Sequence, residues 1–204
     1  MHFAAPLEVA RHMQGFVAPW CIAGGWALDL FLNAVTRAHA DIEILVFRED
    51  QLALQRHLCG FALARIVEGR ELPWPSGENV EESVHQLRAR SVDSGFDIFL
   101  GESDGARWIY RRDRRLSCPK NDAIQTAPCG LPILAPEIAL LFKAKHLLPK
   151  DQADFERVVP LLSGRSLDWL RHGLAQAHPE SPGTQAINAG RSLPAASATE
   201  LHFG

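Results

Sequence analysis

Two carboxylates spaced two residues apart, Asp41 and Glu43, are the side chains of this sequence best suited to binding a metal ion. The run 39–47 alternates polar and apolar residues, which predicts a strand with both carboxylates on one face. Two neighbouring carboxylates repel each other unless a cation lies between them, and their hard oxygen atoms suit Mg²⁺. Acidic residues are also common on a solvated strand face, so the residues alone leave that interpretation equally open.

A glycine pair, Gly24-Gly25, precedes this acidic strand. The apolar run 20–23 predicts a buried strand, and the apolar run after the glycines predicts a buried helix that ends near Asn33. Backbone N–H groups at such a helix start can approach an anion, and phosphate is favoured there. A phosphate site beside a magnesium site indicates a nucleotide.

A third carboxylate, Asp97, interrupts the apolar strand predicted at 96–100. A buried carboxylate is costly unless it binds a metal or a partner. Asp97 is therefore the best candidate to complete a two-metal site and to accept a proton from an attacking hydroxyl. A buried salt bridge to an arginine remains the alternative.

The remaining pattern predicts an α/β part followed by helices. Further elements of the α/β part are a helix at 5–18, a helix at 49–58, strands at 61–67, 83–90 and 108–111, and a loop at 69–80. Helices are expected at 136–147, 151–162 and 166–177, with Asp151 and Ser166 as caps and Pro160 as a kink. The expected units are an α/β domain at 1–134, a helical part at 135–177 and a flexible tail at 178–204.

Two ordered motif runs resemble the aminoglycoside nucleotidyltransferase-like branch of the DNA polymerase β-type nucleotidyltransferase superfamily. The first is Trp20-x-x-x-Gly24-Gly25-Trp26-Ala27-Leu28-Asp29 with Val35-Thr36-Arg37-x-His39-x-Asp41-Ile42-Glu43. The second is Ala135-Pro136-Glu137-Ile138-Ala139-Leu140-Leu141-Phe142-Lys143-Ala144-Lys145-His146 with Lys150-Asp151-x-x-Asp154-Phe155. The matches span about residues 20 to 170.

The resemblance implies that a nucleoside triphosphate, expected to be ATP, and Mg²⁺ bind at Gly24, Gly25, Asp41 and Glu43. A substrate hydroxyl then attacks the α-phosphate and pyrophosphate leaves. By position, Asp41 and Glu43 hold the metals, while Asp97 completes the metal set and acts as the general base.

Basic residues near these motifs are candidates for phosphate binding. Arg37 and His39 precede the acidic pair, with a salt bridge to Asp29 or Asp41 as the alternative. Three of the four lysines lie in the helical motif, and Lys143 and Lys150 are assigned to the nucleotide. Lys143 and Lys145 point to different faces of a helix, so at most one enters the site. Helix capping is the favoured interpretation of the two acids that follow Lys150, namely Asp151 and Asp154.

Departures from the family pattern concern the acceptor. Glu43 stands where aspartate is more common, and Asn33-Ala34 stands where Gly-Arg is common. A polycationic aminoglycoside needs further carboxylates, and the candidates are Glu78, Glu81, Glu82 and Glu102. Trp74 and Trp108 are candidates for stacking on a sugar or lincosamide ring, with core packing as the alternative for Trp108.

Charge and composition limit the kinds of binding partner that are expected. Net charge is −3 and the sequence pI is about 6.3, which disfavours a stable nucleic-acid partner. No apolar run of membrane-spanning length and no signal-peptide pattern is present, so a cytoplasmic protein without a membrane partner is expected. The four widely spaced cysteines predict no zinc or redox motif, and either a monomer or a homodimer is expected.

The expected fold is α+β, with a mixed β-sheet flanked by helices and followed by a C-terminal helical part. The expected function is magnesium-dependent transfer of a nucleoside monophosphate to a hydroxyl of an aminoglycoside-like antibiotic. Two alternatives remain: a nucleotidyltransferase that modifies protein or tRNA in a toxin or antitoxin pair, and a catalytically silent module that binds nucleotide or a partner.

Overall fold

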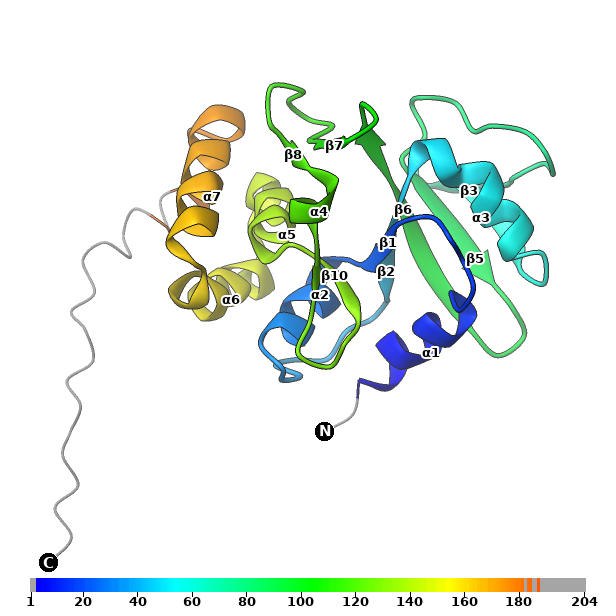
Figure 1. Cartoon of the computed structure of the whole chain (residues 1–204), viewed down its shortest axis with the longest axis horizontal. Helices are drawn as coiled ribbons and strands as arrows, with labels where there is room; N and C mark the ends of the chain where they lie inside the picture. The colour runs from blue at the N-terminus through cyan, green and yellow to red at the C-terminus, as the bar shows by residue number, and fades with distance from the viewer. Residues whose placement is uncertain (1–2, 182, 185–186, 188–204) are drawn as a thin grey trace, which may run out of the picture.

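The computed structural model describes residues 3–181, 183–184 and 187, and a mixed sheet runs through its centre (Figure 1). The sheet has ten strands, with the order β4-β3-β5-β6-β2-β1-β10-β9 and with β7 linking β6 to β8. Strands β2 and β6 are parallel, as are β1 and β10, while the other pairs are antiparallel. The strands are β1 Trp20–Ile22, β2 Glu43–Phe47, β3 Ala62–Val67, β4 Arg70–Pro73, β5 Gln86–Arg90, β6 Gly95–Ser103, β7 Arg107–Ile109, β8 Ser117–Pro119, β9 Ile124–Thr126 and β10 Pro132–Leu134.

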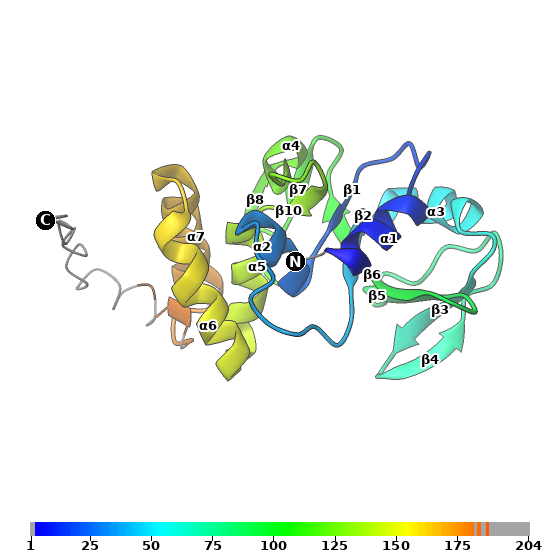
Figure 2. The ribbon, with the colours of Figure 1, turned by 90° about the horizontal axis from the view of Figure 1, so that it is seen from below.

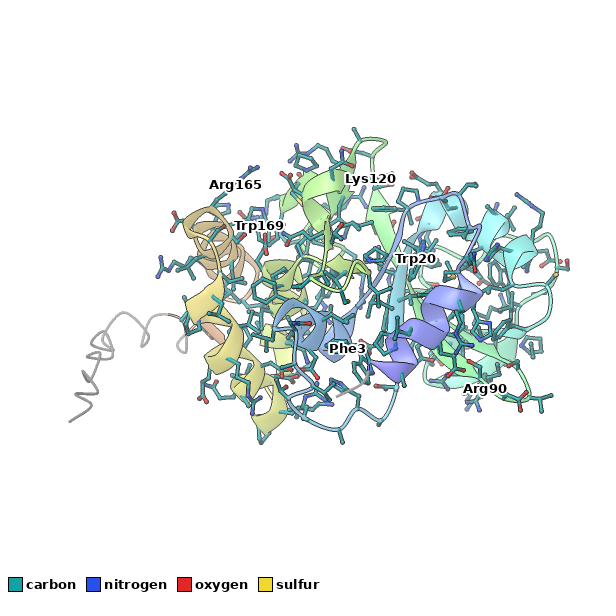
Figure 3. All side chains as sticks on the ribbon, turned by 60° about the horizontal axis from the view of Figure 1, so that its bottom comes forward. Phe3, Trp20, Arg90, Lys120, Arg165 and Trp169 are labelled. Atoms are coloured by element: carbon teal, nitrogen blue, oxygen red, sulfur yellow. The ribbon has the colours of Figure 1, made fainter. Side chains whose placement is uncertain are left out.

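Helices cover the sheet and form one end of the molecule, with α6 and α7 at the opposite end from β3 and β4 (Figure 2). Arg165 and Trp169 of α7 therefore lie far from Arg90 of β5 (Figure 3). The helices are α1 Ala4–His12, α2 Gly24–Phe31, α3 Gln51–His57, α4 Lys120–Ala123, α5 Pro136–Lys143, α6 Pro149–Val158 and α7 Gly164–Ala177, with 3-10 turns at Arg48–Asp50, Ala144–His146 and Val159–Leu161. None of the helices in the described residues has the length and apolar character needed to cross a lipid bilayer.

The two faces of the central strands have different partners. Side chains alternate along a strand, so Glu43 and Leu45 face one side while Ile44 faces the other. On the second side, the His12 ring of α1 lies edge-on to Phe61 and stacked on Phe96, with centroid distances of 5.0 and 6.4 Å. The first side is left for the functional groups.

The C-terminal helices pack against the glycine-led helix. Helix α5 contacts α2, α6, α7 and β10. Its apolar residues Ile138, Leu140 and Leu141 are buried in the same core as Leu28 and Leu30 of α2. The mixed sheet with a helical C-terminal part is therefore confirmed.

Several local predictions were wrong. The strand expected at 39–47 begins only at Glu43, and the N-terminal helix ends at His12 rather than near residue 18. The loop expected at 69–80 contains the edge strand β4, whose polar side chains conceal its strand character. The cap of α7 is the hydroxyl of Ser163, which accepts a hydrogen bond from the Ser166 N–H at 3.2 Å.

Other predictions hold with shifted bounds. Helix α6 ends before Pro160, and a 3-10 turn continues the chain, as a proline inside a helix requires. The sequence pattern missed β8, α4, β9 and β10, because each has only three or four residues. Most of the predicted tail at 178–204 lies outside the described residues.

Candidate active site

Helix α2 begins with Gly24 and Gly25, directly after strand β1. Its N-cap, Ala23, makes no side-chain hydrogen bond to the first turn. Gly24 has a φ of +61°, and a Cβ there would overlap the Glu43 carboxylate. A Cβ on Gly25 would lie 2.7 Å from Cε1 of His39. The glycine pair therefore allows side chains of the acidic segment to lie directly against an uncapped helix N-terminus, where backbone N–H groups can bind an anion.

Three carboxylates converge near this helix start. Glu43 is the first residue of β2 and pairs in register with Asp97 of β6, while Asp41 is exposed in the segment before β2. The pKa of Glu43 is raised, first by burial and then by the negative charges of Asp41 and Asp97, with Lys143 and Lys150 opposing the shift. Asp41 and Asp97 therefore lie close enough to Glu43 to act on it electrostatically.

Asp97 is held in an ion pair. The Nε of Arg88 on β5 donates to Oδ1 of Asp97 at 2.6 Å, and its Nη2 donates to Oδ2 at 3.0 Å. The side-chain amide of Gln86 donates to the same Oδ2 at 2.9 Å. These contacts with Asp97 raise the pKa of Arg88 above its ordinary value. The salt bridge considered in the sequence analysis is therefore present.

The fit to a magnesium ion differs among the three carboxylates. Asp41 and Glu43 have the hard oxygen atoms and the spacing that suit Mg²⁺, and neither carboxylate accepts a side-chain hydrogen bond from the described residues. Asp97 fits as a third ligand only if Arg88 moves away. Across residues 3–181, no group of three His, Cys, Asp or Glu side chains is already arranged to hold a metal.

His39 is anchored to α2. Its Nε2 lies 2.7 Å from Oδ2 of Asp29, and its ring stacks on Trp26 with centroids 4.3 Å apart. The hydroxyl of Thr36 donates to the other Asp29 oxygen at 2.6 Å. Burial raises the pKa of Asp29, but these hydrogen bonds outweigh burial, so the net shift is downward. Of the interpretations left open for His39, the structure contains the pair with Asp29.

Buried acids of α6 hold two of the predicted phosphate-binding cations. Nζ of Lys143 on α5 lies 2.7 Å from Asp151 and 3.0 Å from Asp154. Arg37 contacts Asp154 at 3.5 Å, rather than Asp29 or Asp41. Asp151 also caps α6 by accepting the Leu148 N–H at 3.2 Å. Asp151 thus caps the helix from its third residue, while the N-cap itself is Leu148 and not Asp151 as expected, and Asp151 also positions Lys143. Asp154 forms ion pairs and is not a cap.

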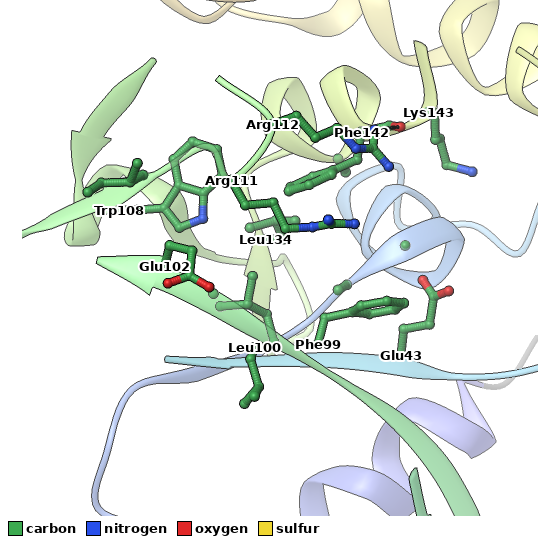
Figure 4. A pocket seen from close by; sticks show the side chains of 16 residues that line it. Glu43, Phe99, Leu100, Glu102, Trp108, Arg111, Arg112, Leu134, Phe142 and Lys143 are labelled. Carbon is green, nitrogen blue, oxygen red and sulfur yellow. Dashed lines mark hydrogen bonds between the residues drawn. The ribbon is translucent and has the colours of Figure 1, made fainter. Parts of the chain in front are cut away.

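Two cavities meet at Glu43 and Lys143. The outer pocket, of about 200 Å³, brings the predicted basic and acidic residues together and is lined by Ala23, Gly25, Trp26, Arg37, Ala38, His39, Ala40, Asp41, Glu43, Lys143 and Lys150. The inner cavity, of about 220 Å³, lies between the sheet and α5 and includes Gly24, Phe99, Glu102, Trp108, Arg111, Arg112 and Phe142 (Figure 4).

Several candidates for acceptor recognition lie elsewhere. Trp74 is buried and donates its ring N–H to the Glu78 carbonyl at 2.7 Å, so it does not present a stacking surface at the site. Glu81 pairs with Arg65, and neither Glu78 nor Glu82 lines either of these two cavities. Glu102 does line the inner cavity, as does Trp108. Lys145 is exposed and lines neither, which agrees with the prediction that only one of the two lysines enters.

Two arginines of the inner cavity, Arg111 and Arg112, were not among the functional residues predicted from the sequence. They directly follow the apolar run Trp108-Ile109-Tyr110, and this abrupt change from apolar to basic residues was the available signal. The pKa of Arg111 is lowered by burial, and Arg112 and Arg48 add to that shift.

Known proteins resemble this chain in its fold and in part of its sequence. Residues 7–104 match the family model of aminoglycoside-2''-adenylyltransferase. The antibiotic-resistance factor ANT(2'')-Ia aligns over 92% of this chain and 89% of its own, with 16% identity and a TM-score of 0.50. The lincosamide antibiotic adenylyltransferase LnuA, solved with lincomycin bound, aligns over 76% of this chain and 95% of its own, with 15% identity and a TM-score of 0.53. No curated protein sequence matches the chain.

The fold is that of the nucleotidyltransferase class, because both aligned structures share it over most of their length. Residues 7–104, which carry Gly24, Asp41, Glu43 and Asp97, match the aminoglycoside-2''-adenylyltransferase model, so the chain resembles that family over just under half of its length. Helices α5 to α7 lie beyond the matched segment.

Proposed function

We propose that this protein is a magnesium-dependent nucleotidyltransferase that transfers a nucleoside monophosphate from ATP to a hydroxyl of a small antibiotic-like molecule. The observation that carries the proposal is the outer pocket, in which Asp41 and Glu43 lie beside an uncapped helix start and three cations. Carboxylates for a metal and donors for phosphate are thus within one cavity, as transfer from a nucleoside triphosphate requires.

Each residue then has a defined task. Asp41 and Glu43 would hold Mg²⁺, which when bound neutralises phosphate charge. The first N–H groups of α2 bind phosphate oxygens, and Lys150 neutralises the departing pyrophosphate, since it is exposed at the pocket and has no ion pair in the described residues. Lys143, positioned by Asp151 and Asp154, neutralises charge nearer to Glu43.

The transfer step exchanges one bond for another. The acceptor oxygen forms a bond to the α-phosphorus, the bond from that phosphorus to the pyrophosphate oxygen breaks, and the hydroxyl proton moves to a carboxylate. Asp97 takes this proton once Arg88 has released at least one of its oxygen atoms.

Pyrophosphate release tests this proposal. Each of the four nucleoside triphosphates is supplied with Mg²⁺ and a panel of aminoglycosides and lincosamides. We expect acceptor-dependent release that EDTA abolishes, and a loss of at least a hundredfold for Asp41→Asn and Asp97→Asn. Asp104→Asn, an exposed acid in the turn between β6 and β7, is the matched control and keeps full activity.

The outcomes separate the alternatives. Full activity of Asp97→Asn contradicts its role as the base. Nucleotide binding without any pyrophosphate release supports the silent binding module, which the existing Arg88–Asp97 pair favours.

A further inference from the structure

The inner cavity has an apolar wall of a kind suited to a ring. Phe99 of β6 lies on the sheet side of the cavity, and Phe142 of α5 lies across from it (Figure 4). Leu45 of β2 and Trp108 of β7 also line the cavity. At about 220 Å³ it is smaller than the roughly 300–1,000 Å³ of sites that enclose a drug-sized molecule. It therefore accommodates one part of a ligand and leaves the remainder outside.

Arg111 is a half-buried cation that forms no ion pair with the described residues, although Glu102 of the same cavity attracts it at longer range. Its side chain extends along the cavity toward Glu43 (Figure 4), and it makes no ion pair or side-chain hydrogen bond with any residue in the described part of the chain. Burying a guanidinium without acceptors is costly, because its N–H groups lose water and gain nothing in return. A ligand atom that accepts hydrogen bonds would remove this cost.

Arg112 adds a second positive charge with neutral partners only. Its Nη1 donates to the Phe142 carbonyl at 2.9 Å and to the Tyr110 hydroxyl at 3.3 Å. Its guanidinium lies over the Phe142 ring at 5.3 Å from the centroid. Neither contact neutralises its charge.

The carboxylates of the inner cavity are already engaged. Glu102 forms an ion pair with Arg48 at 2.7 Å and lies 3.8 Å from His85. Glu43, at the other end, is assigned to the metal. The cavity thus contains two guanidinium groups without ion pairs, of which Arg112 is exposed, while both of its carboxylates are directed to other partners. The charge left for a ligand therefore disfavours ammonium groups.

Reaction geometry indicates which substrate enters this cavity, and this step rests on the proposed function. Phosphoryl transfer places the attacking and leaving oxygens roughly in line. The outer pocket holds the cations suited to pyrophosphate, and Glu43 separates it from the inner cavity. The acceptor therefore enters through the inner cavity, and its hydroxyl must reach past Glu43 to the neighbouring Asp97, which lines neither cavity.

We propose that the inner cavity binds the acceptor and that Arg111 selects for acceptors with few positive charges. The preferred acceptor has an apolar ring for Trp108 and Phe142 and an oxygen atom that accepts hydrogen bonds from Arg111. A polycationic aminoglycoside is disfavoured, in contrast to the expectation from sequence.

Two acceptors with different charge test the selection. Lincomycin carries one amine and tobramycin carries several. With ATP and Mg²⁺, we expect kcat/KM of the wild-type protein to be at least tenfold higher for lincomycin. Arg111→Glu reverses the charge at the cavity and lowers this ratio at least tenfold. Arg114→Glu, an exposed arginine three residues away that lines neither cavity, makes the same charge change and leaves the ratio unaltered.

Calorimetric binding of both acceptors to the same three proteins, with a non-hydrolysable ATP analogue present, gives the ratio without turnover. A binding preference for lincomycin that only Arg111→Glu removes supports the cavity proposal even if no pyrophosphate forms, and that combination contradicts the proposed function alone. Preference for tobramycin, equal effects of Arg111→Glu and Arg114→Glu, or binding of neither compound overturns the cavity proposal. A raised KM for ATP with an unchanged acceptor KM assigns Arg111 to the nucleotide and overturns it as well.

Discussion

At the scale of single residues, the environment of Asp97 decides how the site works. The carboxylate is buried and receives two hydrogen bonds from Arg88 and one from Gln86. This arrangement keeps a charged group inside the protein when no substrate is bound, because every added hydrogen bond offsets part of the desolvation cost. In the proposed reaction, Asp97 must then exchange the arginine for a metal or a substrate hydroxyl.

Replacing Arg88 should show how far the buried Asp97 depends on it for stability. Arg88→Gln leaves the buried Asp97 without its charged partner, so we expect the free energy of unfolding to fall by about 1–3 kcal/mol. Arg90→Gln, which removes only a surface contact to Glu71 at 3.2 Å, should change it by less than about 0.5 kcal/mol. Urea unfolding measures both values. Equal stability of the two variants would show that Arg88 does not stabilise the ionised Asp97.

At the scale of elements, the turn from β1 into α2 positions the site. Its glycines allow the Glu43 carboxylate to lie against the helix start, and Asp29 of α2 anchors the segment that carries Asp41 through His39 and Thr36. One short helix therefore orients both the phosphate donors and the acidic segment.

Gly24→Ala should disrupt the turn for two separable reasons. It places a Cβ at positive φ and drives that Cβ into Glu43. Gly15→Ala is the matched control, because Gly15 also has a positive φ, +82°, but its Cβ would have no neighbour within 4 Å. We expect both variants to lose about 1 kcal/mol of stability and only Gly24→Ala to lose pyrophosphate release. Retained activity in Gly24→Ala would contradict the close approach of helix and carboxylate.

The anchor at Asp29 should make stability depend on pH. Because the folded pKa of Asp29 lies below its unfolded value of about 3.9, its stabilisation is present above about pH 4 and is lost as the pH falls through the folded pKa. We expect Asp29→Asn to lower the free energy of unfolding by about 2 kcal/mol at pH 6, and we expect the difference from wild type to shrink by pH 3. Urea unfolding at both pH values checks this. A difference that is the same at both would exclude the ionised carboxylate as its source.

At the scale of the whole molecule, the helical part completes the site. Lys143 and Lys150 come from α5 and α6, while Asp41 and Glu43 come from the sheet part. The contacts of Asp154 with both Arg37 and Lys143 join the two parts at the pocket. The outer pocket therefore does not exist in either part alone.

The sequence predicted what local patterns encode. Strand β1, helix α2 and the acid within β6 follow from apolar runs, glycines and an interrupted hydrophobic pattern. A salt bridge from Asp97 to an arginine was one of the two interpretations that the sequence left open. The arginine could not be named, because its identity depends on the register between β5 and β6. The placement of Arg111 in the inner cavity also could not be predicted, because it depends on where α5 packs against the sheet.

Transfer of a nucleotide, rather than of a single phosphate, defines the proposed reaction. The most direct test is mass spectrometry of lincomycin and tobramycin after incubation with the protein, Mg²⁺ and ATP. We predict that one of them gains the mass of an adenosine monophosphate group and that an equal amount of pyrophosphate forms. A gain of one phosphate with formation of ADP, or unchanged acceptors while ATP is bound, would contradict the proposed nucleotide transfer.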